Sequence, residues 1–311
     1  MLKTWLMSWV AAALWMPAAP ATALDRGQGK LLLTGGVNSI DGAAGGGITP
    51  WAPIGTQATR GQWGATASVS GLRTADYALR VHGVALAADD RLALSLAHQN
   101  LDLRNDLAAL GLADLQLKQD ILGLKLRLAG EAVLDSDTVM PQLAVGLLHK
   151  RADAGALTPT LTGVIGARTC GTELFVSATK LLLGPALLLN GTLRWTDANQ
   201  NGLLGFGSGE SSGQGGGQSR GRRLMPEVSL AWLPHRHWAV GAEWRAKPDN
   251  LDRSALRQGA LKEDAWADVF VVWAPVQAFS LTLAAVDIGR IAPGLQPRRQ
   301  RGGYLSAQIG F

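Results

Sequence analysis

The sequence predicts an all-β fold, a transmembrane antiparallel up-and-down β-barrel of about 12 strands. From about residue 61 onward, segments of roughly ten residues alternate apolar with polar or small side chains, which is the period of a strand with two different faces. The links between these segments alternate between short and long after the first hairpin, as in outer-membrane barrels. The 39 glycines and 11 tryptophans also suit many strands and turns.

The first residues have the pattern of a targeting segment. Lys3 gives a positive start, residues 5–15 form a short apolar core, and Ala21-Thr22-Ala23 offers a cleavage site. The core is shorter than the roughly 20 residues that a membrane-spanning helix needs. We therefore expect residues 1–23 to be a cleaved signal peptide, and the mature protein to be exported to the cell outer membrane.

Residues 24–60 do not fit the alternation. Residues 30–37 could form one strand, but residues 42–47 are rich in glycine and alanine. One interpretation is an irregular segment that plugs the lumen. The other is an extra hairpin that raises the barrel to 14 strands. We favour the plug, with residues 61–311 as the barrel. The residues that mark the plug are Gly35, Gly36, Gly45, Gly46, Gly47 and Trp51.

The strand pattern is clearest at residues 122–128, where a strand would place four leucines on one face and Lys125 and Arg127 on the other. Twelve segments follow it, and their lengths fit the roughly 9 to 11 residues of a tilted membrane-spanning strand. Phe270 and Val272 weaken one case. The segments lie near residues 61–71, 77–87, 91–103, 118–129, 140–151, 172–181, 186–196, 224–233, 238–247, 265–274, 278–288 and 302–311.

An even number of strands returns both ends of the barrel to the periplasm. Phe311 then ends the last strand there, as in substrates of the barrel-assembly machinery, which we expect as a partner during insertion. Tryptophan and tyrosine favour membrane–water boundaries, so the aromatic residues should form two girdles on the apolar face. The expected girdle residues are Trp63, Tyr77, Trp195, Trp232, Trp238, Trp244, Trp273, Phe279 and Phe311.

Charged residues on the polar faces should line the lumen, because a charge on the lipid face costs roughly 2 to 4 kcal/mol at the midplane. Their excess of positive charge predicts a pore that favours anions. The alternative is a set of ion pairs between strands that fills a narrow barrel. The expected lumen residues are Arg80, His82, Arg91, Lys125, Arg127, Lys150, Glu173, Arg194, Glu227, Glu243, Arg245 and Asp268.

Other classes of function find little support. The basic residues are scattered, which does not predict nucleic-acid binding. The glycines at 42–47 lack the Lys-Ser/Thr pair of a phosphate-binding loop. His98 and Asn100 share a face, but no serine is placed beside them to complete a catalytic set. No cluster has metal-ligand spacing, and Cys170 alone cannot form an internal disulfide. We expect no enzyme activity and no cofactor.

The N-terminal part of the mature chain resembles a family of uncharacterised proteobacterial outer-membrane proteins, a domain of unknown function. The resemblance rests on residues 29–37 and 41–51, with weaker support from 119–128 and 141–151. It implies an outer-membrane barrel with a shared glycine-rich start, and it implies no substrate.

Two hypotheses of function follow. The first is a passive channel or uptake protein for a small solute, anionic if the positive bias holds, narrowed by residues 30–60. The second is a closed barrel with a structural, adhesion or lipid-interaction role through its external loops. Outer-membrane lipids and lipopolysaccharide are expected partners in either case.

Overall fold

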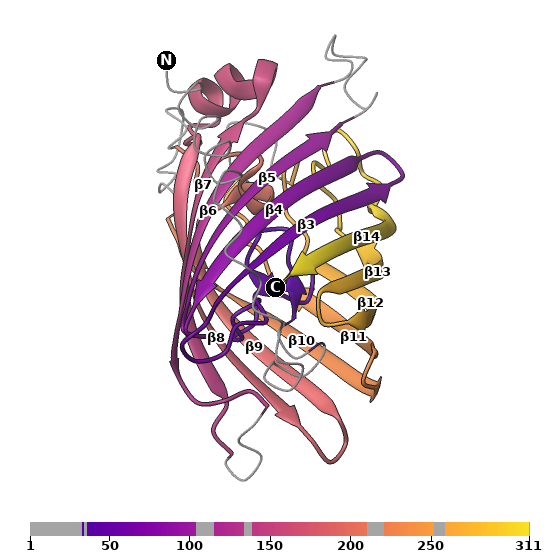
Figure 1. Ribbon diagram of the computed structural model, residues 1–311. Coiled ribbons are helices and arrows are strands. Elements are labelled where there is room, and N and C mark those ends of the chain that lie inside the picture. The colour runs from indigo at the N-terminus through magenta and orange to yellow at the C-terminus, as the bar shows by residue number, and fades with distance from the viewer. Residues whose placement is uncertain are drawn as a thin grey trace, which may run out of the picture.

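The computed structural model describes Leu33 and residues 36–103, 115–133, 139–209, 221–251 and 259–310. Twelve antiparallel strands form a closed barrel, in which β14 pairs with β3 (Figure 1). The prediction of a barrel of about 12 strands is confirmed. The strands are β3 (Trp63–Thr74), β4 (Ala78–Ala88), β5 (Leu92–Asp102), β6 (Gln116–Ala129), β7 (Gln142–Asp153), β8 (Cys170–Leu182), β9 (Leu187–Thr196), β10 (Arg223–His235), β11 (Trp238–Arg245), β12 (Trp266–Val276), β13 (Phe279–Asp287) and β14 (Arg301–Gly310).

The alternative of 14 strands is wrong. The two additional strands, β1 (Val37–Asn38) and β2 (Ala44–Gly45), pair only with each other and do not join the barrel. The predicted signal peptide at 1–23, Gly35 of the predicted plug and the terminal Phe311 lie outside the described residues.

Side chains alternate between the two surfaces of the wall. On β6, Leu122, Leu124 and Leu126 point outward and are 40% to 45% exposed, whereas Lys125 points inward and is 4% exposed. The other strands repeat the pattern, so the outside of the barrel is an apolar band. A band of this size in water would oppose folding, and its natural surroundings are lipid. The barrel therefore spans a membrane. Among the described residues, no helix is long and apolar enough to cross a membrane.

Short connections lie at one end of the barrel and long ones at the other. The strand bounds leave short links at 89–91, 183–186, 236–237 and 277–278, and a longer one at 130–141. The opposite end carries 103–115, 154–169, 197–222, 246–265 and 288–300, with the tight hairpin 75–77 as the exception. In the described parts of these long connections, the chain forms the helical turns η2 (Gly155–Leu157), η3 (Thr160–Val164) and η4 (Asn199–Gly202).

The strands tilt relative to the barrel axis, so a row of residues that pair across neighbouring strands moves gradually from one end of the barrel toward the other. One row begins at Trp238 and Trp273, beside the short connections, and reaches Arg151 on β7 near the long connections. The wall on the side of β3 to β7 therefore extends further toward the long connections, as Figure 1 shows. The row runs through Trp238, Trp273, Leu281, Ala307, Val69, His82, His98, Asp120 and Arg151.

Some inward positions are apolar and close-packed. Phe270 and Val272, which weakened the alternation of β12, point inward and are 2% and 4% exposed. A Cβ on Gly241 would overlap the Phe270 ring, and a Cβ on Gly146 would overlap the Phe175 ring. These two glycines make room for aromatic rings inside the wall.

Candidate functional site

The lumen is occupied by residues 36–58, which we call the lumen segment (indigo in Figure 1). Nearly all of its side chains are buried. The segment folds back on itself through the β1–β2 pair and a bridge between Gly45 and Pro50. A side chain on Gly45 would overlap the Thr49 carbonyl, and one on Gly46 would overlap the Glu243 carboxylate. The glycine-rich composition therefore allows the segment to turn tightly against the wall.

Polar side chains of the wall hold the backbone of the lumen segment. The Pro50 carbonyl accepts hydrogen bonds from Thr192 Oγ1 at 2.8 Å and Ser177 Oγ at 3.2 Å. The Ala52 N–H donates to Thr179 Oγ1 at 2.8 Å. Because this part of the chain has little secondary structure of its own, the wall satisfies the backbone groups that a strand or helix would otherwise pair.

Lys125 binds the lumen segment from β6. Its ammonium donates to the carbonyls of Ala44 at 2.8 Å, Trp51 at 2.7 Å and Pro53 at 3.2 Å. A buried ammonium has three protons to share, so three carbonyls use its donor capacity fully. This one residue joins both arms of the segment.

Asp41 is the centre of a buried charge cluster. Its carboxylate lies 3.0 Å from Lys150 Nζ, 3.1 Å from Arg245 Nη1 and 3.4 Å from Arg194 Nη1. Two wall carboxylates complete the cluster: Glu173 lies 2.7 Å from Lys150, and Glu227 lies 2.5 Å from Arg194. The three cations therefore face three anions, and one of those anions belongs to the lumen segment.

A second contact zone involves Glu243 on β11. Its carboxylate accepts hydrogen bonds from the Ile48 N–H at 2.8 Å, from Ser229 Oγ at 2.8 Å and from the Thr49 hydroxyl. Asp268 pairs with Glu243 across the β11–β12 ladder and is also buried. This zone binds the donors of the lumen segment, whereas Lys125 binds its acceptors.

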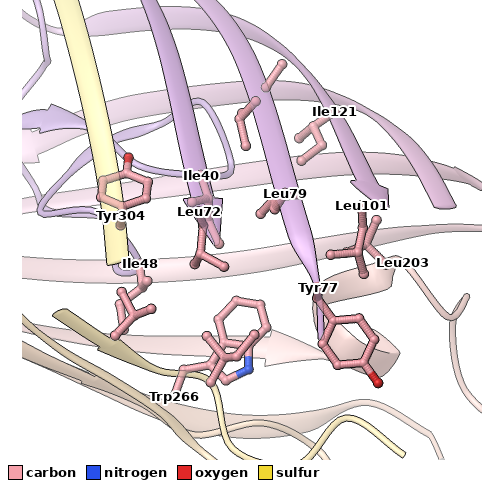
Figure 2. Packing of buried hydrophobic residues seen from close by; sticks show 14 of the residues in the cluster. Ile40, Ile48, Leu72, Tyr77, Leu79, Leu101, Ile121, Leu203, Trp266 and Tyr304 are labelled. Carbon is pink, nitrogen blue, oxygen red and sulfur yellow. The ribbon is translucent and has the colours of Figure 1, made fainter. Parts of the chain in front are cut away.

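The long connection between β9 and β10 folds into the barrel and contacts the lumen segment. Asn201 of η4 donates to Asp41 at 2.8 Å and accepts from Arg245 at 2.7 Å. Apolar residues cover this end, and Figure 2 shows Tyr77 together with Leu79, Leu101 and Leu203 in the buried cluster. A cavity between Lys125 and the lumen segment has a volume of only about 20 Å³, which is room for one water molecule.

Most of the predicted lumen residues do point inward and are buried: Lys125, Lys150, Glu173, Arg194, Glu227, Glu243, Arg245 and Asp268. Arg127 lies at the short-connection end, paired with Asp90 at 2.5 Å and with Glu131. The eight buried residues comprise four cations and four carboxylates. The predicted positive excess is therefore absent from this set.

Three predicted lumen residues lie elsewhere. Arg80 and His82 point outward, because on β4 the inward face is formed by Leu79, Val81 and Gly83. These two positions lie toward the long-connection end of β4, where the outward face becomes polar. Arg91 is an exposed residue of the short turn before β5.

The aromatic girdle contains one error. Tyr77 is 4% exposed and points inward, because it belongs to the hairpin that folds over the lumen. The other predicted girdle residues that the structure describes lie on the outward face, and the ring centroids of Trp238 and Trp273 are 6.2 Å apart at the short-connection end. These outward residues are Trp63, Trp195, Trp232, Trp238, Trp244, Trp273 and Phe279.

A buried ion pair lies outside the membrane-spanning strands, in the connection between β11 and β12. Lys247 Nζ lies 3.6 Å from Glu263 Oε2, which also accepts the Gln200 N–H at 2.9 Å. Burial raises the pKa of Glu263 to about 7, although the positive charge of Lys247 opposes the change. Burial likewise lowers the pKa of Lys247 to about 8. This pair fixes η4 to the neighbouring connection.

Sequence reasoning missed Asp41 and Asn201. Asp41 is the only charged residue between Lys30 and Arg60, which was the available signal that it needs a partner. Asn201 gave no signal, because it lies in a long irregular connection.

His98 and Asn100, which share an outward face of β5, each contact a residue of β6. His98 Nδ1 lies 2.7 Å from Asp120 Oδ1 on the exposed outer surface, and Asn100 donates to Gln116 at 3.1 Å. Among the described residues, no group of three His, Cys, Asp or Glu side chains is placed to hold a metal ion.

A family described as "Protein of unknown function (DUF3034)" matches residues 34–308. No curated protein matches the chain. Among solved structures, the KdgM porin is 6% identical with a TM-score of 0.46 over 79% of this chain and 99% of its own. The NanC porin is 7% identical, with a TM-score of 0.48 over 79% and 98%. An outer membrane channel from Pseudomonas putida F1 is 11% identical, with a TM-score of 0.48 over 82% and 97%. We draw no functional argument from these weak similarities.

Proposed function

Because this chain belongs to the DUF3034 family, whose description gives no function, we propose a function from its own geometry: an outer-membrane channel for a small polar solute, closed at rest by residues 36–58. The observation that carries the proposal is the chemistry of the interface between the lumen segment and the wall. Hydroxyl, amide and carboxylate groups contact Pro50, Ala52 and Ile48, and the Lys125 ammonium contacts the neighbouring Trp51 carbonyl. Water and a polar solute can replace such contacts more readily than they can replace a close-packed apolar core.

The balanced charge of the wall supports a polar solute, with no preference for positive or negative charge. Four cations and four carboxylates line the interior among the predicted lumen residues. The positive bias that favoured anions depended partly on Arg80, His82 and Arg91, which lie outside the lumen. We therefore define the proposed solute by its small size and its polarity, and not by its charge.

Planar-bilayer conductance tests the proposal with three forms of the protein. The wild type should be closed most of the time, and deletion of residues 36–58 should give frequent, larger openings. The third form carries Thr49→Cys and Ser229→Cys in a Cys170→Ser background. The two native hydroxyl oxygens lie 2.5 Å apart, so the two sulfurs can form a disulfide that fixes the lumen segment to β10. Oxidation should abolish openings, and a reductant should restore them.

A second candidate function is a permanently closed barrel with a structural role. The neutral cluster around Asp41 and the apolar residues that cover the long-connection end favour it. The same experiment separates the two candidates. If neither the wild type nor the deletion variant conducts while both keep the heat-modifiable migration of a folded barrel, the channel proposal is wrong.

A further inference from the structure

The outward surface of the barrel carries a groove near the long-connection ends of β13, β14, β3 and β4. Its volume is about 580 Å³, and it opens to the surroundings of the barrel. The lumen segment contributes nothing to it. The side chains and glycines that define the groove are Gly71, Arg73, Arg80, Leu283, Gly303 and Leu305.

Two glycines produce the depression. A Cβ at Gly71 or at Gly303 would have no atom within 4 Å, so neither glycine is required by close packing. Glycine inside a strand weakens the sheet and leaves its face bare, which suggests that another molecule approaches there. Leu283 and Leu305 form the apolar part of the groove and are 61% and 51% exposed.

Two arginines form the polar end. Arg80 pairs with Gly71 across the β3–β4 ladder, and Arg73 follows Gly71 by two positions on the same face. The two arginines are therefore diagonal neighbours on the outward surface. Both are exposed, and neither guanidinium group makes a hydrogen bond or ion pair with another residue in the described part of the chain. Asp102 is the one acidic side chain among the described residues that line the groove, so the groove carries a net positive charge.

Other arginines at the same end are already paired. Arg298 binds Asp76, and both Arg299 and Arg301 lie 3.0 Å from the Asp287 carboxylate. Carboxylates of the protein therefore already occupy the guanidinium groups of these arginines, where an external anion would otherwise bind. Arg73 and Arg80 differ from them in lacking such partners among the described residues.

The height of the arginines matches the headgroups of a bilayer. Ten residues of β3 separate the exposed Trp63, at the short-connection end, from Arg73. At about 3.3 Å per residue and a tilt of about 40°, this separation spans about 25 Å, which is the height of the apolar band of an outer-membrane barrel. Trp63 and Arg73 therefore mark opposite borders of the band, and the groove descends from the upper border into it.

We propose that this groove binds a phosphate-bearing lipid of the outer leaflet. Arg73 and Arg80 hold the phosphate by charge-assisted hydrogen bonds, and one acyl chain lies against Leu283 and Leu305 in the space above Gly71 and Gly303. One explanation then covers the glycines at two strand positions, the exposed leucines and the two arginines whose side chains have no partner among the residues that the structure describes. The proposal does not depend on whether the lumen conducts.

Native mass spectrometry of the full protein in nanodiscs, titrated with diphosphoryl lipid A, tests the proposal. Arg73→Ala with Arg80→Ala should weaken binding roughly thirtyfold, because two cationic contacts to the headgroup are lost. Gly71→Leu with Gly303→Leu should weaken it comparably, although both arginines remain, because the leucines fill the groove. Lipid A without its phosphates should bind the wild type as weakly as diphosphoryl lipid A binds the arginine variant.

A matched control replaces two exposed arginines at the opposite end, Arg60→Ala with Arg236→Ala, and should leave binding unchanged. Heat-modifiable migration on gels verifies that each variant forms a barrel. Equal affinity of the wild type and the arginine variant would overturn the proposal. So would undiminished binding by the glycine variant, an equal loss in the control, or displacement of the lipid by inorganic phosphate at the same concentration.

Discussion

Asp41 of the lumen segment and Lys150 of β7 form an ion pair of 3.0 Å in which the two side chains are 2% and 0% exposed. The pair joins residues 109 positions apart in the chain. Removing Asp41 leaves three wall cations, Lys150, Arg194 and Arg245, with only Glu173 and Glu227 as counter-ions.

We predict that Asp41→Asn lowers the free energy of unfolding by about 3 to 5 kcal/mol, because removing one partner of a buried pair leaves an uncompensated charge. Urea unfolding in lipid vesicles measures it. The control is Asp120→Asn, which breaks the exposed pair with His98 and should cost less than about 1 kcal/mol. A cost for Asp41→Asn as small as that of the control would show that Asp41 does not stabilise the cluster.

Lys125→Met removes the ammonium that binds three carbonyls of the lumen segment. Hydrogen bonds to a charged group contribute about 1.5 to 3 kcal/mol each, so local opening should become at least roughly tenfold more frequent. Hydrogen exchange of the amides in residues 44–53 measures this opening. Lys118→Met, on the exposed face of the same strand, should leave their exchange rates unchanged. Unchanged exchange in both variants would contradict the anchoring role of Lys125.

The Lys247–Glu263 pair predicts a pH dependence of stability. The pKa of Glu263 is about 7 in the folded protein and 4.5 as an isolated side chain, so the folded state holds this proton more tightly. Its contribution to stability is present below pH 4.5 and is lost as pH rises through about 7, by at most about 3 kcal/mol. The lowered pKa of Lys247 acts in the opposite direction and only above about pH 8.

Unfolding measured from pH 5 to pH 8 in the wild type and in Glu263→Gln tests this dependence. The stability of the wild type relative to the variant should fall between pH 5 and pH 7, since the glutamine cannot titrate. Parallel stability curves for the two proteins over this range would refute the prediction.

Gly146→Ala should destabilise the barrel by about 1 to 3 kcal/mol, because its Cβ would overlap the Phe175 ring and overpack the wall. Gly191→Ala is the matched control, since a Cβ on Gly191 meets no atom within 4 Å. The midpoint of urea unfolding should therefore fall for the first variant alone. Adding Phe175→Leu to Gly146→Ala should restore part of the loss, and equal midpoints for the two alanine variants would contradict the packing argument.

The sequence predicts the wall well because the membrane imposes a strict rule there. Outward residues within the apolar band must be apolar, so the leucines of residues 122–128 indicate both the strand and its orientation. The rule ends where a strand leaves the band. Arg80 and His82 lie toward that border on the outward face of β4, and assigning every charged residue to the lumen places both on the wrong face.

The contents of the lumen are harder to predict. The lumen segment has almost no regular structure, so no period indicates which of its residues meets which strand. Asp41 contacts β7, β9 and β11 together, and each of those contacts depends on the closed barrel. Tyr77 illustrates the same limit, because whether a hairpin residue points to lipid or folds over the lumen is decided by tertiary packing.

The place of the lumen segment in the chain determines the order of assembly. It precedes β3, the strand whose pairing with β14 closes the barrel, yet its partners Lys150, Arg194 and Arg245 come 109 to 204 residues later. Contacts across such separations form late, because the intervening chain must first be ordered. The lumen segment is thus synthesised before every strand of the barrel but is the last part of it to acquire native partners, because those partners lie on strands that follow it by more than 100 residues.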